Sequence, residues 1–177
     1  MSIRKPRIAI DMDEVLADPL AKFIRLYNRD YGVPLDLKIE PGNEITSHVP
    51  EHAFNKLEEY INEKGFFRDL EPIPGSIETI KRLQEKYEIF IVSAAMEFPN
   101  SLHDKYEWLA EHCPFIGWQH IIFCGLKIVN VDIIIDDRIK NFKDFDGRKL
   151  LFTSPHNMLI TDYERVNNWD EVGEKLL

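Results

Sequence analysis

Ile8-Ala9-Ile10-Asp11-Met12-Asp13-Glu14-Val15-Leu16-Ala17-Asp18 is a stretch in which a short apolar run ends abruptly in two carboxylates separated by a single residue. An apolar run of this length predicts a buried strand. Polar groups at the exit of such a strand lie at the edge where open parallel sheets bind their ligands. We therefore expect the functional site beside Asp11 and Asp13.

A second acidic pair, Asp136-Asp137, lies far down the chain and also follows an apolar run, residues 131–135. Two parallel strands that both end in carboxylates would bring about four negative charges to one edge of the sheet, which is unfavourable unless a cation lies among them. Carboxylate oxygens are ligands for hard divalent ions. The sequence therefore predicts a metal site, and we expect Mg²⁺ as its cofactor.

The length and charge of the chain limit what it can bind. Its 177 residues suffice for one well-cored domain with a small inserted subdomain, but not for two full domains. A formal net charge of -9 with scattered Lys and Arg argues against a nucleic-acid polymer as partner, because such binding needs clustered basic residues. A small phosphorylated molecule remains compatible with this charge, because a metal ion and a few basic residues can hold a single phosphate.

The sequence also suggests a compartment. No apolar run approaches the length of a membrane span, and the basic N-terminal residues turn acidic too soon for a signal peptide. Cys113 and Cys124 lack the spacing of a zinc site, so we expect both to be reduced and structural. We therefore expect a cytoplasmic protein that does not bind membranes.

Apolar strands and amphipathic helices alternate along the chain, which predicts an α/β fold with a doubly wound parallel sheet. Ser101 with Asp104 three residues later resembles a capping box at the start of one helix, whose apolar side we assign to Leu102, Tyr106 and Leu109. Strands after the first are expected at 88–93, 121–124, 133–136 and 149–152, and helices at 20–31, 54–61, 77–83, 102–113 and 168–177.

The first two strands are separated by some seventy to eighty residues, whereas a simple crossover needs roughly thirty. In the extra residues, apolar side chains recur at the spacing of an α-helix. This pattern predicts a small helical cap inserted after the first strand. We assign residues 1–18 and 74–177 to the α/β core and residues 19–73 to the cap.

Four strand exits carry polar residues in a fixed order along the chain. A carboxylate nucleophile, a hydroxyl, a lysine and an acidic pair are the groups that phosphoryl transfer through an aspartyl-phosphate requires. In chain order these residues are Asp11 and Asp13, Ser93, Lys127, and Asp136 with Asp137.

This order resembles the four motifs of the haloacid dehalogenase superfamily of phosphatases, over nearly the whole chain. More narrowly, the segments 11–18, 66–75 and 135–138 look like those of the 5'(3')-deoxyribonucleotidases. The resemblance implies a Rossmann-like core, a Mg²⁺-dependent phosphomonoesterase and a nucleoside monophosphate, in particular a 5'(3')-deoxyribonucleotide, as substrate. It is compatible with a monomer or a homodimer.

On this resemblance Asp11 attacks the phosphorus, and Asp13 protonates the leaving group and then deprotonates the hydrolytic water. Mg²⁺ would be held by the side chains of Asp11 and Asp137 and by the backbone carbonyl of Asp13. Asp136 would support these ligands from behind. A purely structural alternative for Asp13 is the N-cap of the following helix.

The resemblance assigns phosphate binding to Ser93, to the backbone N–H groups of Ala94 and Ala95, and to Lys127. Ser93 has an alternative as a simple turn residue, and Lys127 as a solvated loop lysine. For the nucleoside, the resemblance points to aromatic cap residues that stack on the base. Phe67 matches one of these residues and Tyr60 is a candidate for another, with packing inside the cap as the alternative for Phe67.

Two other functions are compatible with parts of the sequence. The same chemistry could act on a different small phosphoester, such as a sugar or cofactor phosphate. A non-enzymatic phospho-signalling receiver or binding module also places acidic residues, a hydroxyl and a Lys at strand ends, but a receiver carries its acidic pair early and has no long helical insertion. The late pair Asp136-Asp137 favours the enzyme.

Overall fold

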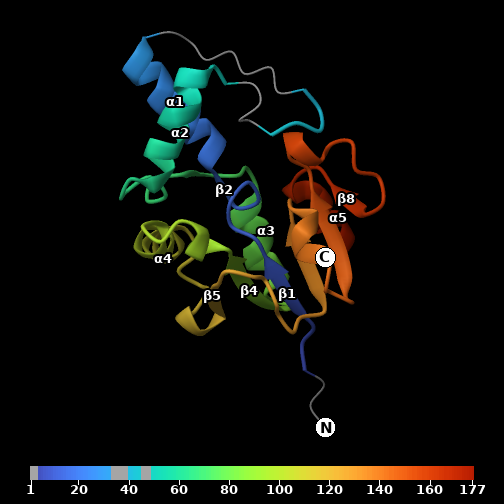
Figure 1. Ribbon diagram of the computed structural model, residues 1–177. Coiled ribbons are helices and arrows are strands. Elements are labelled where there is room, and N and C mark those ends of the chain that lie inside the picture. Colours follow the sequence, from blue (N-terminus) through green and yellow to red (C-terminus); the bar gives the residue numbers. More distant parts are fainter. Residues whose placement is uncertain (1–3, 33–39, 45–48) are drawn as a thin grey trace.

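The computed structural model describes residues 4–32, 40–44 and 49–177. Its centre is a six-stranded sheet in the order β5-β4-β1-β6-β7-β8, with every neighbouring pair parallel (Figure 1). The chain winds outward from β1 in both directions, so the predicted doubly wound parallel sheet is confirmed. The strands are β1 (Arg7–Ile10), β4 (Glu88–Ser93), β5 (Ile121–Phe123), β6 (Ile133–Asp136), β7 (Arg148–Phe152) and β8 (Glu164–Val166).

β1 is central because its side chains are buried on both faces of the sheet. Ile8 and Ile10 belong to the larger hydrophobic core, and Ala9 points to a smaller core on the opposite face that contains Phe142. This alternation follows the period of two along a strand. Ile10 is in register with Ile91 of β4 and Ile135 of β6, so all three strands end at one edge of the sheet.

The predicted helices are present as five α-helices within the described residues. Buried side chains of three of these helices, Ile80 of α3, Trp108 of α4 and Trp169 of α5, belong to the same hydrophobic core as Ile8 and Ile10. The helices are α1 (Pro19–Tyr31), α2 (Glu51–Asn62), α3 (Ser76–Leu83), α4 (Ser101–His112) and α5 (Trp169–Leu176).

α1 and α2 pack against each other at one end of the molecule, beyond the carboxyl edge of the sheet (Figure 1). A short antiparallel ladder between β2 (Ala17–Asp18) and β3 (Glu71–Pro72) joins the two chain crossings that lead out to these helices and back. We propose that residues 19–73 form a cap over the core, with this ladder at its base.

The start of α1 decides one alternative left open by the sequence. Asp18 is the N-cap, and its Oδ1 accepts a hydrogen bond from the Ala21 N–H at 2.8 Å. Asp13 lies five residues before the cap position and instead bridges to Ala17 in the loop after β1. The N-cap role considered for Asp13 is therefore wrong.

The predicted capping box of α4 is also wrong. Ser101 Oγ donates to the carbonyl of Ala95 at 3.3 Å, and Asp104 Oδ2 accepts from the N–H of Gly65 at 2.7 Å. Both side chains are buried, so this helix hydrogen-bonds neighbouring segments rather than its own first turn. Its buried face is consequently rotated from the prediction, because Tyr106 is exposed whereas Lys105 and Trp108 are buried.

Candidate active site

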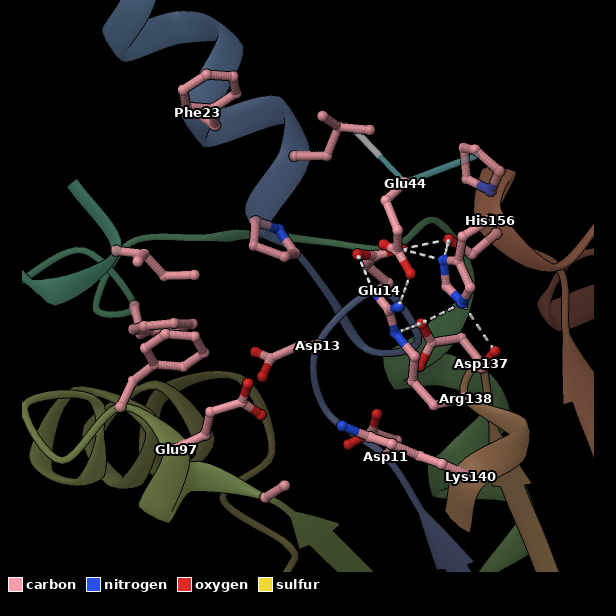
Figure 2. Close-up of a pocket in the computed structure, with 18 of the residues that line it drawn as sticks. Asp11, Asp13, Glu14, Phe23, Glu44, Glu97, Asp137, Arg138, Lys140 and His156 are labelled. Atoms are coloured by element: carbon pink, nitrogen blue, oxygen red, sulfur yellow. Dashed lines mark hydrogen bonds and ion pairs between the residues drawn. The ribbon is translucent and has the colours of Figure 1, made fainter. Parts of the chain in front are cut away.

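A cavity of about 390 Å³ lies at the carboxyl edge of the sheet, between the strand exits and the inserted helices. Asp11, Ala94 and Asp137 line it at the ends of β1, β4 and β6, and Leu57 of α2 also lines it. Figure 2 shows Phe23 of α1 on the side of the cavity opposite Asp11 and Asp137. The convergence of strand exits predicted from the sequence is thus present in the structure.

Asp11 is held in place through one of its two carboxylate oxygens. Its Oδ1 accepts from the Met12 N–H at 2.7 Å and lies 2.6 Å from Lys127 Nζ. Within the described residues Oδ2 has no hydrogen-bond partner, and Asp11 lines the cavity. One oxygen is therefore fixed and the other is available to a bound molecule.

Lys127 lies between two carboxylates. Its Nζ is 2.6 Å from Asp11 Oδ1 and 2.6 Å from Asp136 Oδ2, and its side chain is 2% exposed. Burial opposes its charge, but the two carboxylates outweigh burial and raise the pKa of Lys127 above its usual value. Lys127 is therefore a permanently charged group at the site, not a solvated loop lysine.

Three buried carboxylates form a group that fits a metal ion. Asp11, Asp136 and Asp137 each place one oxygen within 4.8 Å of the others. Asp136 is already committed to Lys127 and to Asn141 Nδ2 at 2.9 Å. Burial and the neighbouring carboxylates raise the pKa of Asp137 well above its usual value, and burial raises that of Asp11. Lys127 and Arg138 offset only part of this negative charge, and the oxygen donors suit a hard divalent cation.

Asp13 also lines the cavity, with its side chain 31% exposed. Its Oδ2 forms an ion pair with Lys105, whereas its Oδ1 is buried and has no hydrogen-bond partner in the described parts of the chain. A buried carboxylate oxygen without a partner is costly unless a ligand or water contacts it. Asp13 thus lines the cavity with one oxygen paired to Lys105 and the other unpaired within the described residues.

Lys105 is a site residue that sequence reasoning missed. It comes from α4 with a side chain that is 1% exposed, and its Nζ lies 3.1 Å from Ser93 Oγ and 4.5 Å from the centre of the Phe67 ring. This one ammonium group therefore contacts Asp13, Ser93 and Phe67. The available signal was its position three residues before Trp108 and four before Leu109, on the helix face that is buried.

The two phosphate-binding candidates at the end of β4 lie where the sequence predicted. Ser93 is the last residue of the strand, is buried, and accepts a hydrogen bond from Lys105. Ala94 lines the cavity. Ala95 is fully buried at the start of the 3-10 helix η2 (Ala95–Glu97) and is not among the described lining residues.

The two aromatic cap candidates have different surroundings. Phe67 lines the cavity and packs edge-on against Phe66, with ring centres 5.0 Å apart. Tyr60 is buried inside the cap, where its hydroxyl donates to Asp30 and its ring lies 6.3 Å from Phe23. Tyr60 is not among the lining residues, so the structure does not support a substrate contact for it.

Arg138 adds a second group of charges that the sequence did not single out. Its Nε lies 3.3 Å from Asp137 Oδ2, and its other nitrogens pair with Glu14 and with Glu44 from the inserted segment. Glu14 has a φ of 58°, a left-handed conformation that is uncommon for a side chain of this type. Figure 2 shows these groups converging on one side of the cavity, with His156 beside them.

His156 and Asn157 orient Asp137 from the 3-10 helix η5 (Pro155–Asn157). His156 Nε2 lies 3.0 Å from the Asp137 carbonyl oxygen, and Asn157 Nδ2 donates to the same oxygen at 2.8 Å. Asn157 is completely buried. Burial, followed by the charge of Arg138, lowers the pKa of His156. The backbone of Asp137 is therefore held by two side chains from the opposite loop.

The fold is that of the haloacid dehalogenase-type hydrolases. A Bacillus subtilis hydrolase of this type, YfnB, described as bound to magnesium, has a TM-score of 0.61 with 17% sequence identity, covering 98% of this chain and 99% of that one. A hydrolase of the same type from Deinococcus radiodurans, described with bound phosphate and sodium, has a TM-score of 0.60 with 14% identity, covering 95% and 93%. At these identities the likeness shows the fold alone.

Sequence comparison identifies the family within this class. Residues 5–177 match the family described as 5' nucleotidase, deoxy (pyrimidine), cytosolic type C protein. A 5'(3')-deoxyribonucleotidase of Bacillus subtilis is 39% identical over 180 residues, covering 98% of this chain and 99% of that protein. A Staphylococcus aureus relative with a provisional name of the same kind is 43% identical over 173 residues, covering 96% and 94%. The chain therefore belongs to this nucleotidase family and is a phosphoric monoester hydrolase.

None of the helices that the structure describes is both long enough and apolar enough to cross a membrane.

Proposed function

We propose that this chain is a Mg²⁺-dependent phosphomonoesterase that hydrolyses nucleoside monophosphates, in particular 5'(3')-deoxyribonucleotides, through phosphorylation of Asp11. The observation that carries the mechanism is the asymmetry of the Asp11 carboxylate: Oδ1 is held by Lys127 and the Met12 N–H, while Oδ2 is available at the cavity. The name of the Bacillus subtilis relative supports the substrate class.

In the first step Asp11 Oδ2 attacks the phosphorus and forms a P–O bond, while the bond between phosphorus and the ester oxygen breaks. Asp13 donates a proton to the leaving oxygen. In the second step the ionised Asp13 takes a proton from water, whose oxygen attacks the phosphorus and releases Asp11 and inorganic phosphate. Asp13 regains its proton in this step, so the cycle closes.

The charges around Asp11 support this reaction. Lys127 balances the anionic nucleophile and, with Ser93 and the N–H of Ala94, would hold the phosphate. The side chains of Asp11 and Asp137 with the backbone carbonyl of Asp13 would hold Mg²⁺, and Asp136 would support them. When bound, the ion supplies positive charge that offsets repulsion between the nucleophile and the phosphate.

The remainder of the cavity suits a largely apolar leaving group. Its wall away from the carboxylates is made mostly of apolar side chains, which would lie against a sugar and base. We assign the base contact to Phe67, because it lines the cavity and is held between neighbouring rings. The apolar side chains on this wall are Pro19, Leu20, Phe23, Leu57, Ile61, Phe66, Phe67 and Phe98.

Phosphate release from a substrate panel tests this proposal. The panel holds 5'- and 3'-monophosphates of pyrimidine and purine deoxyribonucleosides, their ribonucleoside counterparts, and sugar phosphates, each with and without Mg²⁺. We expect Mg²⁺-dependent release that is fastest with deoxyribonucleotides and is lost in Asp11→Asn. Faster release from sugar phosphates would contradict the substrate class and leave the chemistry intact.

We further propose that the enzyme is cytoplasmic and works as a monomer or homodimer. Both cysteines are free thiols, with Cys113 buried and Cys124 half-buried, which is the usual state in a reducing compartment. Light scattering of the purified protein distinguishes the two assembly states, and a tetramer or larger assembly would contradict this part of the proposal.

A further inference from the structure

The charged side chains that line the cavity are almost all paired with an opposite charge. Lys127 pairs with Asp11, Lys105 pairs with Asp13 from behind, and Arg138 pairs with the carboxylates nearest to it. Within the described residues, Glu97 is the one lining carboxylate with no cation partner. The lining residues include six carboxylates, from Asp11, Asp13, Glu14, Glu44, Glu97 and Asp137, and three cations, from Lys127, Arg138 and Lys140.

Glu97 lies on the wall of the cavity that continues from the phosphate-binding strand exit. It is the last residue of η2, three residues after Ala94, and its N–H donates to the Ala94 carbonyl at 3.0 Å. The turn is anchored to the next strand, because the N–H of Met96 donates to the Cys124 carbonyl at 3.3 Å. The backbone of Glu97 is therefore fixed relative to the phosphate site.

The neighbour of Glu97 places it next to the proposed nucleoside pocket. Phe98 lines the cavity, and its ring centre lies 6.1 Å from that of Phe67. Figure 2 shows the Glu97 side chain extending from η2 toward the cavity on the side of Asp13, away from Arg138. An unpaired carboxylate thus borders the space between the reacting phosphate and the aromatic wall.

We propose that Glu97 is a specificity-determining residue that excludes substrates whose leaving group carries a second phosphate, so that the site selects nucleoside monophosphates over nucleoside bisphosphates. The inference rests on the proposed function. The reacting phosphate meets Lys127 and the metal ligands, but a second phosphate on the leaving group would lie near a carboxylate that no cation offsets. Glu97 is exposed, so solvent screens part of this repulsion, and the discrimination that it produces should be several-fold.

Lys140 also lines the cavity, and its positive charge would attract a second phosphate that Glu97 would repel. It belongs to the 3-10 helix η4 (Ile139–Phe142) and forms no ion pair with the described residues. If the leaving group pointed toward Lys140, a second phosphate would be attracted instead of repelled. Removal of each charge in turn separates these two geometries.

The test measures kcat/KM for total phosphate release from a deoxyribonucleoside 5'-monophosphate and from the 3',5'-bisphosphate of the same nucleoside. The variants are Glu97→Gln, Glu97→Lys and Lys140→Gln, and the readout is the ratio of the two values. Glu85→Lys is the matched control for Glu97→Lys, because it makes the same change of net charge. Glu85 is exposed, lies in the turn two residues after α3, and is outside the cavity lining.

We expect the parent protein to prefer the monophosphate by about fivefold, the size expected for like charges about 4 Å apart that solvent partly screens. Glu97→Gln should reduce this preference and Glu97→Lys should abolish or reverse it, while Glu85→Lys and Lys140→Gln leave the ratio near that of the parent. An unchanged ratio in Glu97→Lys, or a bisphosphate preference that is lost in Lys140→Gln, would overturn the inference. If the parent releases no phosphate from any substrate, the proposed function itself fails.

Discussion

Lys105 of α4 is buried and forms an ion pair with the partly exposed Asp13 of the loop after β1, and the same Nζ lies 3.1 Å from Ser93 Oγ. The proposed acid–base group and the proposed phosphate ligand therefore share one cation. Because the other Asp13 oxygen has no partner in the described residues, Lys105 is the main contact that fixes the orientation of this carboxylate. Lys105 is thus a positioning residue for Asp13.

The first prediction concerns Lys105→Met. Loss of the ion pair leaves Asp13 free to rotate, so kcat/KM should fall roughly a hundredfold, the lower end of what acid–base catalysis contributes. Lys22→Met is the matched control, because Lys22 is also a buried lysine that pairs with an aspartate, Asp69, but does not line the cavity. Equal loss of activity in both variants, at equal folded fraction, would contradict the role of Lys105.

The second prediction compares two buried cap aromatics. Tyr60→Phe removes a hydrogen bond to Asp30 inside the cap, so the free energy of unfolding should fall by about 1 kcal/mol with KM unchanged. Phe67→Leu alters the cavity wall, so KM for a deoxyribonucleotide should rise several-fold. Urea unfolding and steady-state kinetics on both variants check this. If KM rises in Tyr60→Phe but not in Phe67→Leu, Tyr60 rather than Phe67 contacts the substrate, and the prediction is wrong.

The third prediction concerns pH and Mg²⁺. The pKa values of Asp11 and Asp137 are raised by burial in the folded, metal-free chain, so between the unfolded and folded pKa values the folded chain binds more protons than the unfolded chain. The stability contributed by these two groups therefore decreases as pH rises through that window. Because Mg²⁺ competes with these protons, the rise in Tm on adding it should be larger at about pH 8 than at about pH 5.

Differential scanning fluorimetry at several pH values measures this effect. Asp137→Asn is the control, since it removes one proposed ligand together with its titration. An equal increase in Tm with Mg²⁺ at all pH values, or an increase that persists in Asp137→Asn, would show that the ion binds elsewhere.

The fourth prediction concerns the contact between the inserted segment and the core. Gly42 has a φ of 87°, its N–H donates to the Pro155 carbonyl at 2.9 Å, and a Cβ there would lie 2.6 Å from Leu159 Cδ1. Gly42→Ala should therefore lower the free energy of unfolding by about 1 kcal/mol or more through backbone strain. Gly32→Ala, also at positive φ but with open space around it, separates strain from crowding. If both variants lose the same free energy of unfolding, backbone strain alone explains the loss, and crowding against Leu159 contributes nothing.

The sheet and the four polar strand exits were predictable because each follows an apolar run long enough to be read as a buried strand. β8 was missed, since Glu164-Arg165-Val166 is short and mostly polar and is defined only by its pairing with β7. Local patterns also failed where a polar side chain bonds to a distant segment. Asp104 has the spacing of a capping residue but accepts from Gly65, which no local signal shows.

In the candidate site, too, some residues carry a local sequence signal and others are placed only by tertiary packing. Asp11, Ser93 and Lys127 carry motif positions that the sequence displays. In the structure Asp11 and Lys127 line the cavity, whereas Ser93 is buried beside it against Lys105 and is not among the described lining residues. Lys105 could not be assigned from the sequence, because a lysine within a helix is an ordinary surface residue until the fold buries it. Arg138 lies in the matching segment 135–138, but no sequence signal indicates its ion-pair partners. Their contacts with Asp13 and Asp137 arise only from the tertiary packing.

Phosphorylation of Asp11 is tested most directly by rapid acid quenching of the Asp13→Asn variant during turnover of p-nitrophenyl phosphate, followed by peptide mass spectrometry. The leaving group of this substrate needs no protonation, so the first step proceeds, while the second step lacks the group that activates water. We expect a burst of p-nitrophenol and one phosphoryl group on the peptide that contains Asp11. Turnover by the parent with no phosphorylated peptide in the variant, or with the phosphoryl group on another residue, would contradict it.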